Sequence, residues 1–308
     1  MSVTYNLATH AAADGPRAGI VLDNAIVDIS TLLGEPSYAT ITGLLANWKS
    51  ARVALNSAVK TKSREVARHS LKDATLLAPV LYPPAIYCAG ANYADHIQEM
   101  AGIAGIKLPP DPRALGIQPW HFLKASRTVI GTDSVTTLPP ISKTLDWEAE
   151  LAAVIGIPAK NVPVEKALDY VAGYTIANDL SARDLMASPN VPASSPFRFD
   201  WFAHKSFDGS CPLGPWIEPA DQISDPQNLA IKLWVNDVVK QDSSTSRMIF
   251  SLAEQIAHLS SRITLHPGDL ILTGTPAGVG MARGEFLKPG DTVKISIERI
   301  GTLTSKIA

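Results

Sequence analysis

Residues 145–156 read Leu-Asp-Trp-Glu-Ala-Glu-Leu-Ala-Ala-Val-Ile-Gly, and this stretch decides the fold. Its second half, from Leu151 to Ile155, is a short apolar run typical of a strand that is buried on both faces. Glu148 and Glu150 precede that run at alternate positions, so a strand would direct both side chains to one face. Two carboxylates that close repel each other unless a cation neutralises them. The stretch therefore predicts either a divalent-metal site or a solvated strand edge whose glutamates face water.

The composition limits the class of protein. The chain has 308 residues, of which 46% are hydrophobic and 18% charged, and its net charge is −2 at pH 7. These values are typical of a folded globular chain with one large domain or two unequal ones, and they indicate no attraction to nucleic acid or a membrane. Cys88 and Cys211 form no paired zinc motif. Without an apolar run of bilayer length or a secretion signal, we expect a cytoplasmic protein.

The first part of the chain predicts a small α+β domain over residues 1–80, followed by a larger domain over residues 81–308. Two β-type runs flank an Asp23-Asn24 pair that suits a tight hairpin. Further on, a helical stripe is expected from the spacing of apolar side chains at Ile41, Leu44, Leu45 and Trp48. A proline-rich connector then separates the two predicted domains.

A possible general base follows the predicted buried strand at residues 85–90. If residues 91–100 form a short helix, His96 and Glu99 lie three positions apart on one face. A carboxylate beside an imidazole raises its basicity and fixes its orientation, which suits a base that deprotonates water. The alternative is a His–Glu pair on a polar helix surface.

A third carboxylate can join Glu148 and Glu150. Residues 171–177 predict another buried strand, and Asp179 comes directly after its end. A set of carboxylate oxygens favours Mg²⁺ or Mn²⁺ over zinc, which prefers nitrogen and sulfur ligands. The alternative for Asp179 is an ordinary capping residue.

Two lysines are candidates for the same pocket. Lys124 follows a predicted long loop at residues 101–120 and can meet an anionic substrate group, although it can equally be a surface lysine. The alternation along residues 201–208 predicts that His204 and Lys205 point to opposite faces, with His204 structural. Lys205 would then enter the carboxylate pocket, where an ammonium group can stabilise an enolate.

The C-terminal part predicts strands, including a hairpin with its turn at Asn236-Asp237. Residues 274–280, Gly-Thr-Pro-Ala-Gly-Val-Gly, follow a predicted strand at residues 269–273. Such a turn lets backbone amides and the Thr275 hydroxyl approach a carboxylate or phosphate closely. It is not a phosphate-binding P-loop, because no Gly-Lys-Ser/Thr follows.

Several segments in a fixed order resemble the fumarylacetoacetate hydrolase superfamily. They are residues 90–96, 146–150, 178–184, 205–208, 211–215 and 272–280. The resemblance covers residue 85 to the C-terminus and implies a mixed β-roll, usually in a homodimer. It also implies that the small N-terminal α+β domain is the cap of the longer members.

The resemblance also assigns roles to individual residues. It implies a site for Mg²⁺, Mn²⁺ or sometimes Ca²⁺, formed by Glu148, Glu150 and Asp179. It implies a catalytic group in which His96 and Glu99 activate water and Lys205 provides electrostatic stabilisation. It implies substrate contacts from Lys124 and Thr275.

The activity that the resemblance favours is hydrolysis of a C–C bond in a β-diketo acid, such as an acylpyruvate or fumarylacetoacetate-like compound from aromatic catabolism. Water activated by the dyad attacks the distal carbonyl and leaves an enolate that the metal and Lys205 stabilise. The alternative is an oxo-acid decarboxylase, lyase or dehydratase on the same site. A non-catalytic metabolite-binding protein is a third possibility, but it would not need a water-activating pair.

Two residues depart from the family pattern. Ala91 stands where many members carry a larger side chain, and Met186 stands where decarboxylating and acylpyruvase relatives carry glutamine. The loss of the glutamine amide favours hydrolysis over decarboxylation. The long loop at residues 186–200 predicts a different substrate tail.

Overall fold

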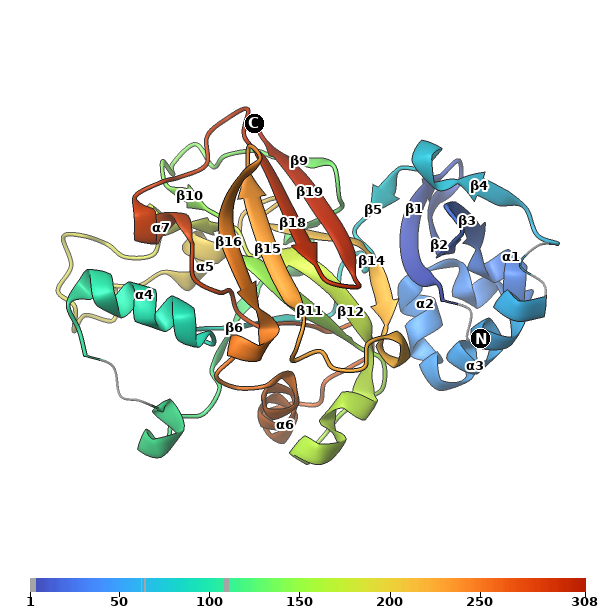
Figure 1. The fold of residues 1–308 in the computed structure, drawn as a ribbon, viewed down its shortest axis with the longest axis horizontal. Coiled ribbons are helices and arrows are strands. Elements are labelled where there is room, and N and C mark those ends of the chain that lie inside the picture. The colour runs from blue at the N-terminus through green and yellow to red at the C-terminus, as the bar shows by residue number, and fades with distance from the viewer. Residues whose placement is uncertain (1–3, 62, 64, 108–110) are drawn as a thin grey trace.

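The computed structural model describes residues 4–61, 63, 65–107 and 111–308 (Figure 1). The fold is mixed α+β and rich in sheet, as the sequence predicts. Part of the predicted loop at residues 101–120, namely residues 108–110, lies outside the described residues. Among the helices in the described ranges, none is both long enough and apolar enough to span a bilayer.

The elements fall into three consecutive groups. The first contains β1 (Asn6–Ala12), β2 (Gly15–Leu22), β3 (Ala25–Asp28), α1 (Ile29–Leu33), α2 (Ile41–Ala46), α3 (Trp48–Thr61), β4 (Arg68–Ser70) and β5 (Leu76–Leu77). The second contains β6 (Ile86–Ala89), α4 (Ala94–Ala104), β7 (His121–Lys124), β8 (Val129–Ile130), β9 (Ser134–Thr136), β10 (Leu145–Asp146), β11 (Ala149–Ile155), β12 (Val171–Asn178), β13 (Ser181–Ala182), α5 (Trp201–Lys205) and β14 (Cys211–Pro219). The third contains β15 (Ala230–Val235), β16 (Val238–Ser244), α6 (Leu252–Arg262), β17 (Leu270–Leu272), α7 (Gly280–Arg283), β18 (Thr292–Ile297) and β19 (Gly301–Ile307).

Short 3₁₀ helices connect these elements. They are Pro36–Ala39, Leu71–Asp73, Pro112–Leu115, Ser126–Thr128, Val164–Tyr170, Arg183–Leu185, Ala220–Gln222 and Thr245–Arg247. The strands form a large sheet in the order β4-β3-β2-β1-β14-β12-β11-β17-β6-β7, with β5 beside β1 and β8 beside β14. A second sheet has the order β16-β15-β18-β19-β9, and β10 pairs with β13.

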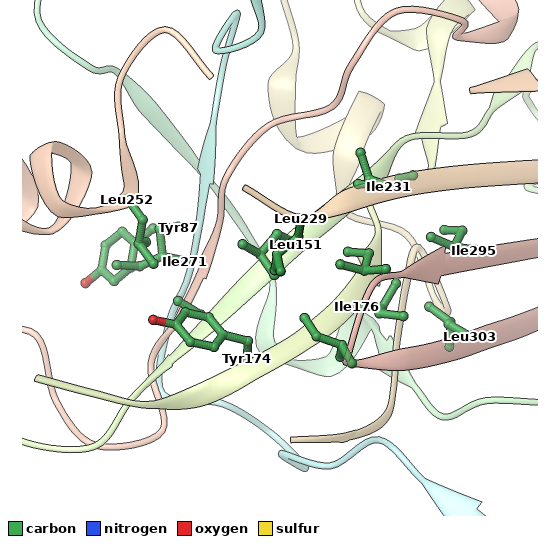
Figure 2. Packing of buried hydrophobic residues seen from close by; sticks show 14 of the residues in the cluster. Tyr87, Leu151, Tyr174, Ile176, Leu229, Ile231, Leu252, Ile271, Ile295 and Leu303 are labelled. Carbon is green, nitrogen blue, oxygen red and sulfur yellow. The ribbon is translucent and has the colours of Figure 1, made fainter. Parts of the chain in front are cut away.

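Strand β11 lies inside the large sheet and is buried on both faces, as its apolar run predicts. Leu151, Ala153 and Ile155 face a core that β15, β18 and β19 close from the other side. Figure 2 shows this packing, with Leu151 and Ile176 near Ile231 and Ile295. The alternate residues of β11 face a second core that includes side chains of the N-terminal helices. Because both faces are covered, the end of β11 is a firmly held position for charged groups.

The predicted hairpins are confirmed, whereas the predicted helical stripe is only partly right. Asp23 and Asn24 have φ values of 49° and 59°, the left-handed conformation that a two-residue turn between twisted strands requires. The four apolar side chains of the stripe are buried, but they belong to two helices. The chain breaks at Asn47, which ends α2 with non-helical φ of −121°.

The N-terminal elements lie at one end of the molecule, where β1 continues the large sheet (Figure 1). Leu7 of β1 pairs with Ile217 of β14, and one core joins N-terminal helix residues such as Leu55 to Leu270 and Leu272 of β17. The N-terminal elements therefore share both a sheet and a core with the rest of the chain. The division into domains at residues 1–80 and 81–308 stays a prediction.

Candidate metal centre

The three predicted metal ligands lie together. Glu148 directly precedes β11, Glu150 is the second residue of β11, and Asp179 directly follows β12. The two strands are antiparallel, and the Asp179 N–H donates to the Glu148 carbonyl at 2.9 Å. All three side chains are buried, and one oxygen from each carboxylate lies within 4.8 Å of the others. Strand pairing therefore brings into one site carboxylates that are far apart in the sequence.

Two lysines contact these carboxylates directly. The Lys205 Nζ donates to Glu148 Oε2 and Asp179 Oδ2, both at 2.7 Å. The Lys124 Nζ donates to Asp179 Oδ1 at 2.7 Å and is itself buried. Burial alone would raise the pKa of Glu148, but Lys205 and Arg183 outweigh it and hold that pKa well below its usual range. Both predicted lysines therefore lie at the carboxylate site, whereas their contact with substrate stays a prediction.

Glu150 is held differently, because no lysine or arginine contacts it in the described hydrogen bonds. Its Oε2 accepts the Gly274 N–H at 2.7 Å. Burial, together with the negative charges of Asp179 and Glu148, raises the pKa of Glu150 well above its ordinary value. A cation at this position would relieve that repulsion and stabilise the charged form.

The charge of the cluster fits a divalent ion. Four described carboxylates, those of Asp146, Glu148, Glu150 and Asp179, face three cations, those of Lys124, Lys205 and Arg183. One negative charge is left over, so a bound divalent ion makes the cluster net positive, which suits an anionic substrate. The ligand set is all oxygen, as Mg²⁺ or Mn²⁺ prefers. The residues present thus fit the predicted metal.

Arg183 belongs to the site, although the sequence analysis assigned it no role. Its Nε donates to Asp146 Oδ2 at 2.8 Å, and its Nη2 pairs with Glu148. Asp146 is fixed in turn by the backbone N–H groups of Trp147, Gly280 and Met281. The sequence carried a signal for Arg183, because a buried Asp146 two positions before Glu148 requires a cation nearby.

His96 and Glu99 both lie on α4, and His96 borders the cavity, but the contact between the two side chains is loose. The His96 Nδ1 is 3.9 Å from Glu99 Oε2, which is longer than a hydrogen bond. Glu99 Oε2 accepts the Gly278 N–H at 2.9 Å, and His96 lines the cavity with Glu148 and Glu150. Burial acts to raise the pKa of Glu99, but His96 and the Gly278 N–H outweigh it and lower that pKa. The role of the pair as a water-activating dyad stays a prediction.

The strand predicted at residues 201–208 is wrong. Residues Trp201–Lys205 form α5, capped by Asp200, whose side chain accepts the Ala203 N–H at 2.9 Å. His204 and Lys205 are both buried and both line the cavity, instead of pointing to opposite faces. The capping carboxylate ahead of an apolar stretch outweighs the short alternation that indicated a strand.

Thr275 supports the end of β11. Its hydroxyl donates to the Ala149 carbonyl at 2.9 Å and accepts from the Gln241 side-chain amide at 2.9 Å. The Gln241 side chain also accepts the Ala149 N–H at 2.9 Å. Thr275 therefore positions the strand that carries Glu150, and its predicted contact with substrate stays a prediction.

A cavity of about 190 Å³ opens over the carboxylates. Besides the acidic and basic groups, aromatic rings form part of its wall. The Phe122 and Trp201 rings stack with centroids 5.2 Å apart, and Trp120 meets Trp201 edge-on at 5.5 Å. No periodicity in the sequence predicts these rings, because they lie in or beside the predicted loops. Burial and Lys205 lower the pKa of the neighbouring His204 to about 4, so this imidazole is neutral at pH 7.

The fold and the buried carboxylate cluster fit an enzyme whose site can hold a divalent metal through oxygen ligands. The family described as "Fumarylacetoacetate (FAA) hydrolase C-terminal" matches residues 85–308. The chain therefore belongs to the fumarylacetoacetate hydrolase family, as the ordered motifs predict.

Relatives within this family have several activities. A rat protein named "Oxaloacetate tautomerase Fahd2a, mitochondrial" is 39% identical over 95% of this chain and 87% of its own length. The maleylpyruvate hydrolase of Sphingobium sp. SYK-6, solved with manganese(II) and pyruvate, has a TM-score of 0.75, 30% identity and 98% coverage of both chains. The 5-carboxymethyl-2-hydroxymuconate delta-isomerase of Mycobacterium smegmatis has a TM-score of 0.73 and 31% identity, and covers 98% of this chain and 99% of its own. Membership alone therefore leaves the reaction open.

Proposed function

We propose that this protein is a divalent-metal-dependent hydrolase that cleaves a C–C bond of a β-diketo acid of the acylpyruvate type. The observation that carries the proposal is the joint position of two groups on one cavity. The first is the buried carboxylate triad, which meets the cavity at Glu148 and Glu150 beside Lys205. The second is His96, which has Glu99 Oε2 3.9 Å from its Nδ1. The solved relative with manganese(II) and pyruvate supports the same combination of metal and keto acid.

Each part of the site has a task in this reaction. Glu148, Glu150 and Asp179 would hold a divalent cation, which supplies a Lewis acid for the keto oxygens. His96 takes a proton from water, and the water oxygen bonds to the distal carbonyl carbon of the substrate. Glu99, fixed by the Gly278 N–H, places a negative charge 3.9 Å from His96 Nδ1 and so stabilises the charged form of the imidazole.

The second half of the reaction breaks the C–C bond between the distal carbonyl carbon and the methylene carbon. The electron pair goes to the pyruvate fragment as an enolate, and the distal fragment leaves as a carboxylic acid. Lys205, already directed at the carboxylates, stabilises the developing negative charge. The proton held by His96 then converts the enolate into pyruvate, which balances the reaction.

The test is turnover of acetylpyruvate with Mg²⁺ or Mn²⁺, followed by the loss of diketone absorbance and the release of pyruvate. We expect activity that EDTA abolishes. The His96→Ala variant should lose roughly 10²–10⁴-fold in kcat, because a general base contributes about that much, while Mn²⁺ binding is retained. The exposed His69 provides the matched control, and His69→Ala should behave like the unaltered protein. Full turnover by His96→Ala would contradict the proposal.

A second candidate is keto–enol tautomerisation of oxaloacetate, which the name of the 39% identical rat relative suggests. It needs the same enolate stabilisation but no attacking water. Met186, which lines the cavity, offers no N–H donor to a second carboxylate, which counts against a dicarboxylic substrate such as oxaloacetate. Oxaloacetate enol decay measured beside pyruvate release distinguishes the two reactions, because only the hydrolase cleaves acetylpyruvate.

A homodimer and a cytoplasmic location also stay predictions. We propose both from the resemblance and the composition. Sedimentation of the purified protein tests the dimer, and microscopy of a tagged chain tests the location.

A further inference from the structure

A second and larger cavity adjoins the one above the carboxylates. It has a volume of about 730 Å³, compared with about 190 Å³ for the first. Gly90, Ala91 and Trp120 line both cavities. The two cavities are therefore adjacent at these three residues, and we call the larger one the tail chamber.

The junction between the two cavities is built from the smallest side chains and one indole. A Cβ atom on Gly90 would lie 2.0 Å from Cζ2 of Trp120, so only glycine lets the indole lie at this place. Ala91 adds a single methyl group and has φ of 50°. A larger side chain at position 91 would occupy the junction. The small side chain of Ala91 leaves this space open.

The tail chamber is mainly apolar. Its hydrocarbon lining comes from α4, from the segment before β7 and from residues 248–250, namely Ile97, Ile117, Met248, Ile249 and Phe250. Ile117 is 44% exposed and Trp120 is 42% exposed. Large apolar side chains gathered at an open cavity beside a reaction site indicate a binding surface for an apolar group.

The charges around the tail chamber disfavour a second carboxylate on the ligand. Arg113 is the only cation among the described residues that line it, and it is already paired, with Nη2 3.0 Å from Glu254 Oε1. The same guanidinium lies 4.8 Å from the centroid of the Phe250 ring. Asp111 adds a negative charge to the lining. A carboxylate entering here would lose water without gaining a free cation.

We propose that the tail chamber binds an uncharged, apolar acyl tail of several carbons on the keto-acid substrate. This inference rests on the proposed function, because the carboxylate site must hold the keto-acid head. It deepens that function by naming the substrate class: monocarboxylic keto acids with a hydrocarbon tail are preferred over dicarboxylic ones of equal length. Ala91 and Trp120 are the specificity-determining residues at the junction.

The test is the binding of straight-chain 2-oxo acids, from pyruvate to 2-oxooctanoate, to the Mn²⁺-loaded protein by calorimetry. We expect Kd to fall about fourfold for each methylene group that becomes buried. The dicarboxylic 2-oxosuberate, of equal length, should bind at least about tenfold more weakly than 2-oxooctanoate. These measurements use the unaltered protein, so they do not depend on whether a variant folds.

Variants then locate the effect. Ala91→Leu fills the junction and Ile97→Ala removes lining, so each should reduce the ratio of the pyruvate Kd to the 2-oxooctanoate Kd several-fold. Leu115 lies two positions before Ile117, is 63% exposed and lines neither cavity. The Leu115→Ala variant should therefore leave the ratio of the two Kd values unchanged.

The outcomes separate this inference from the proposed function. Two results would overturn the role of the tail chamber and leave the proposed function standing. One is that pyruvate binds but Kd is independent of chain length, and the other is that 2-oxosuberate binds as tightly as 2-oxooctanoate. If no 2-oxo acid binds, both are overturned.

Discussion

The cavity has two walls that differ in how they are held. The strand wall consists of Glu148 and Glu150 at the start of β11, and the buried Asp179 at the end of β12 lies directly behind them. The other wall, which we call the loop wall, consists of Trp120 and Met186 together with Trp201, the first residue of α5. Trp120 and Trp201 remain 42% and 39% exposed. The carboxylates lie where strand pairing fixes the backbone, whereas the apolar groups lie outside the paired strands. This difference suggests that the strand wall serves the reaction and the loop wall serves the choice of substrate.

The energetic cost of a change also differs between the walls. On the strand wall, removing one partner leaves a buried charge without compensation, which costs about 3–5 kcal/mol. On the loop wall, an aromatic pair contributes roughly 0.5–1.5 kcal/mol beyond the area that it buries. Variants in the two walls should therefore affect different measurements.

The largest effect is expected for Glu150→Gln in the strand wall. Glutamine keeps the shape of the side chain and leaves no lysine or arginine unpaired, so the protein should fold. It removes one metal ligand, and kcat/KM should fall on the order of 10³-fold, because a Lewis acid supplies several kcal/mol to the barrier. The measurement is turnover together with thermal unfolding. Mg²⁺ should raise the Tm of the unaltered protein but not of the variant, and an equal rise in both would remove Glu150 from the ligand set.

The next effect is a loss of stability in Arg183→Leu. This change leaves Glu148 and Asp146 without the guanidinium that pairs with both. We expect the free energy of unfolding to fall by about 3 kcal/mol, measured by urea denaturation. Arg247, with 60% of its side chain exposed, is the control, and Arg247→Leu should change stability by less than about 0.5 kcal/mol. An equal loss of stability in both variants would show that burial of the Arg183 ion pairs does not increase their contribution to stability.

A smaller effect on stability is expected for Trp201→Ala in the loop wall. The indole packs on Phe122 and Trp120 but is partly exposed, so the loss should be about 1.5 kcal/mol. KM should rise more than kcat falls if the ring, which lines the cavity, contacts substrate away from the reacting atoms. The Trp201→Phe variant should have a KM close to that of the unaltered protein. Phe197 lies four residues before Trp201 and is 82% exposed, so Phe197→Ala should change neither KM nor kcat. A change confined to kcat would contradict the division between the walls.

The smallest effect concerns Glu218, a buried carboxylate on β14 outside both walls. Glu148 has two cations in contact and a lowered pKa, whereas burial raises the pKa of Glu218 from 4.5 to about 7. Between these pH values the folded protein holds a proton that the unfolded chain releases, so stability falls as the pH rises from 4.5 to 7. Glu218→Gln should flatten this dependence by about 1 kcal/mol or less, because solvent screens part of it. Urea unfolding at pH 5 and pH 7.5 measures how much the free energy of unfolding changes with pH. An equal change in Glu218→Gln and the unaltered protein would contradict the prediction.

The sequence predicted the strand wall well and the loop wall poorly. Glu148 and Glu150 beside an apolar run give a local signal, because a two-residue period and burial constrain each other. Asp179 could be added only because its strand was recognisable and the family resemblance gave the order of the motifs. The stacking of Phe122, Trp120 and Trp201 depends on contacts between segments that are distant in sequence, and no periodicity encodes them. Lys205 was placed in the site correctly, but on the wrong kind of element.

The pairing of β1 with β14 has a consequence for biosynthesis. Asn6 and Glu218, which are 212 positions apart in the chain, are hydrogen-bonded across this pair of strands. Strand β1 therefore cannot complete its pairing until β14 has also been synthesised. Such a high contact order slows folding and leaves an unpaired edge available to other nascent chains. Chaperone dependence during translation should accordingly be greater for this protein than for a chain whose neighbouring strands are consecutive.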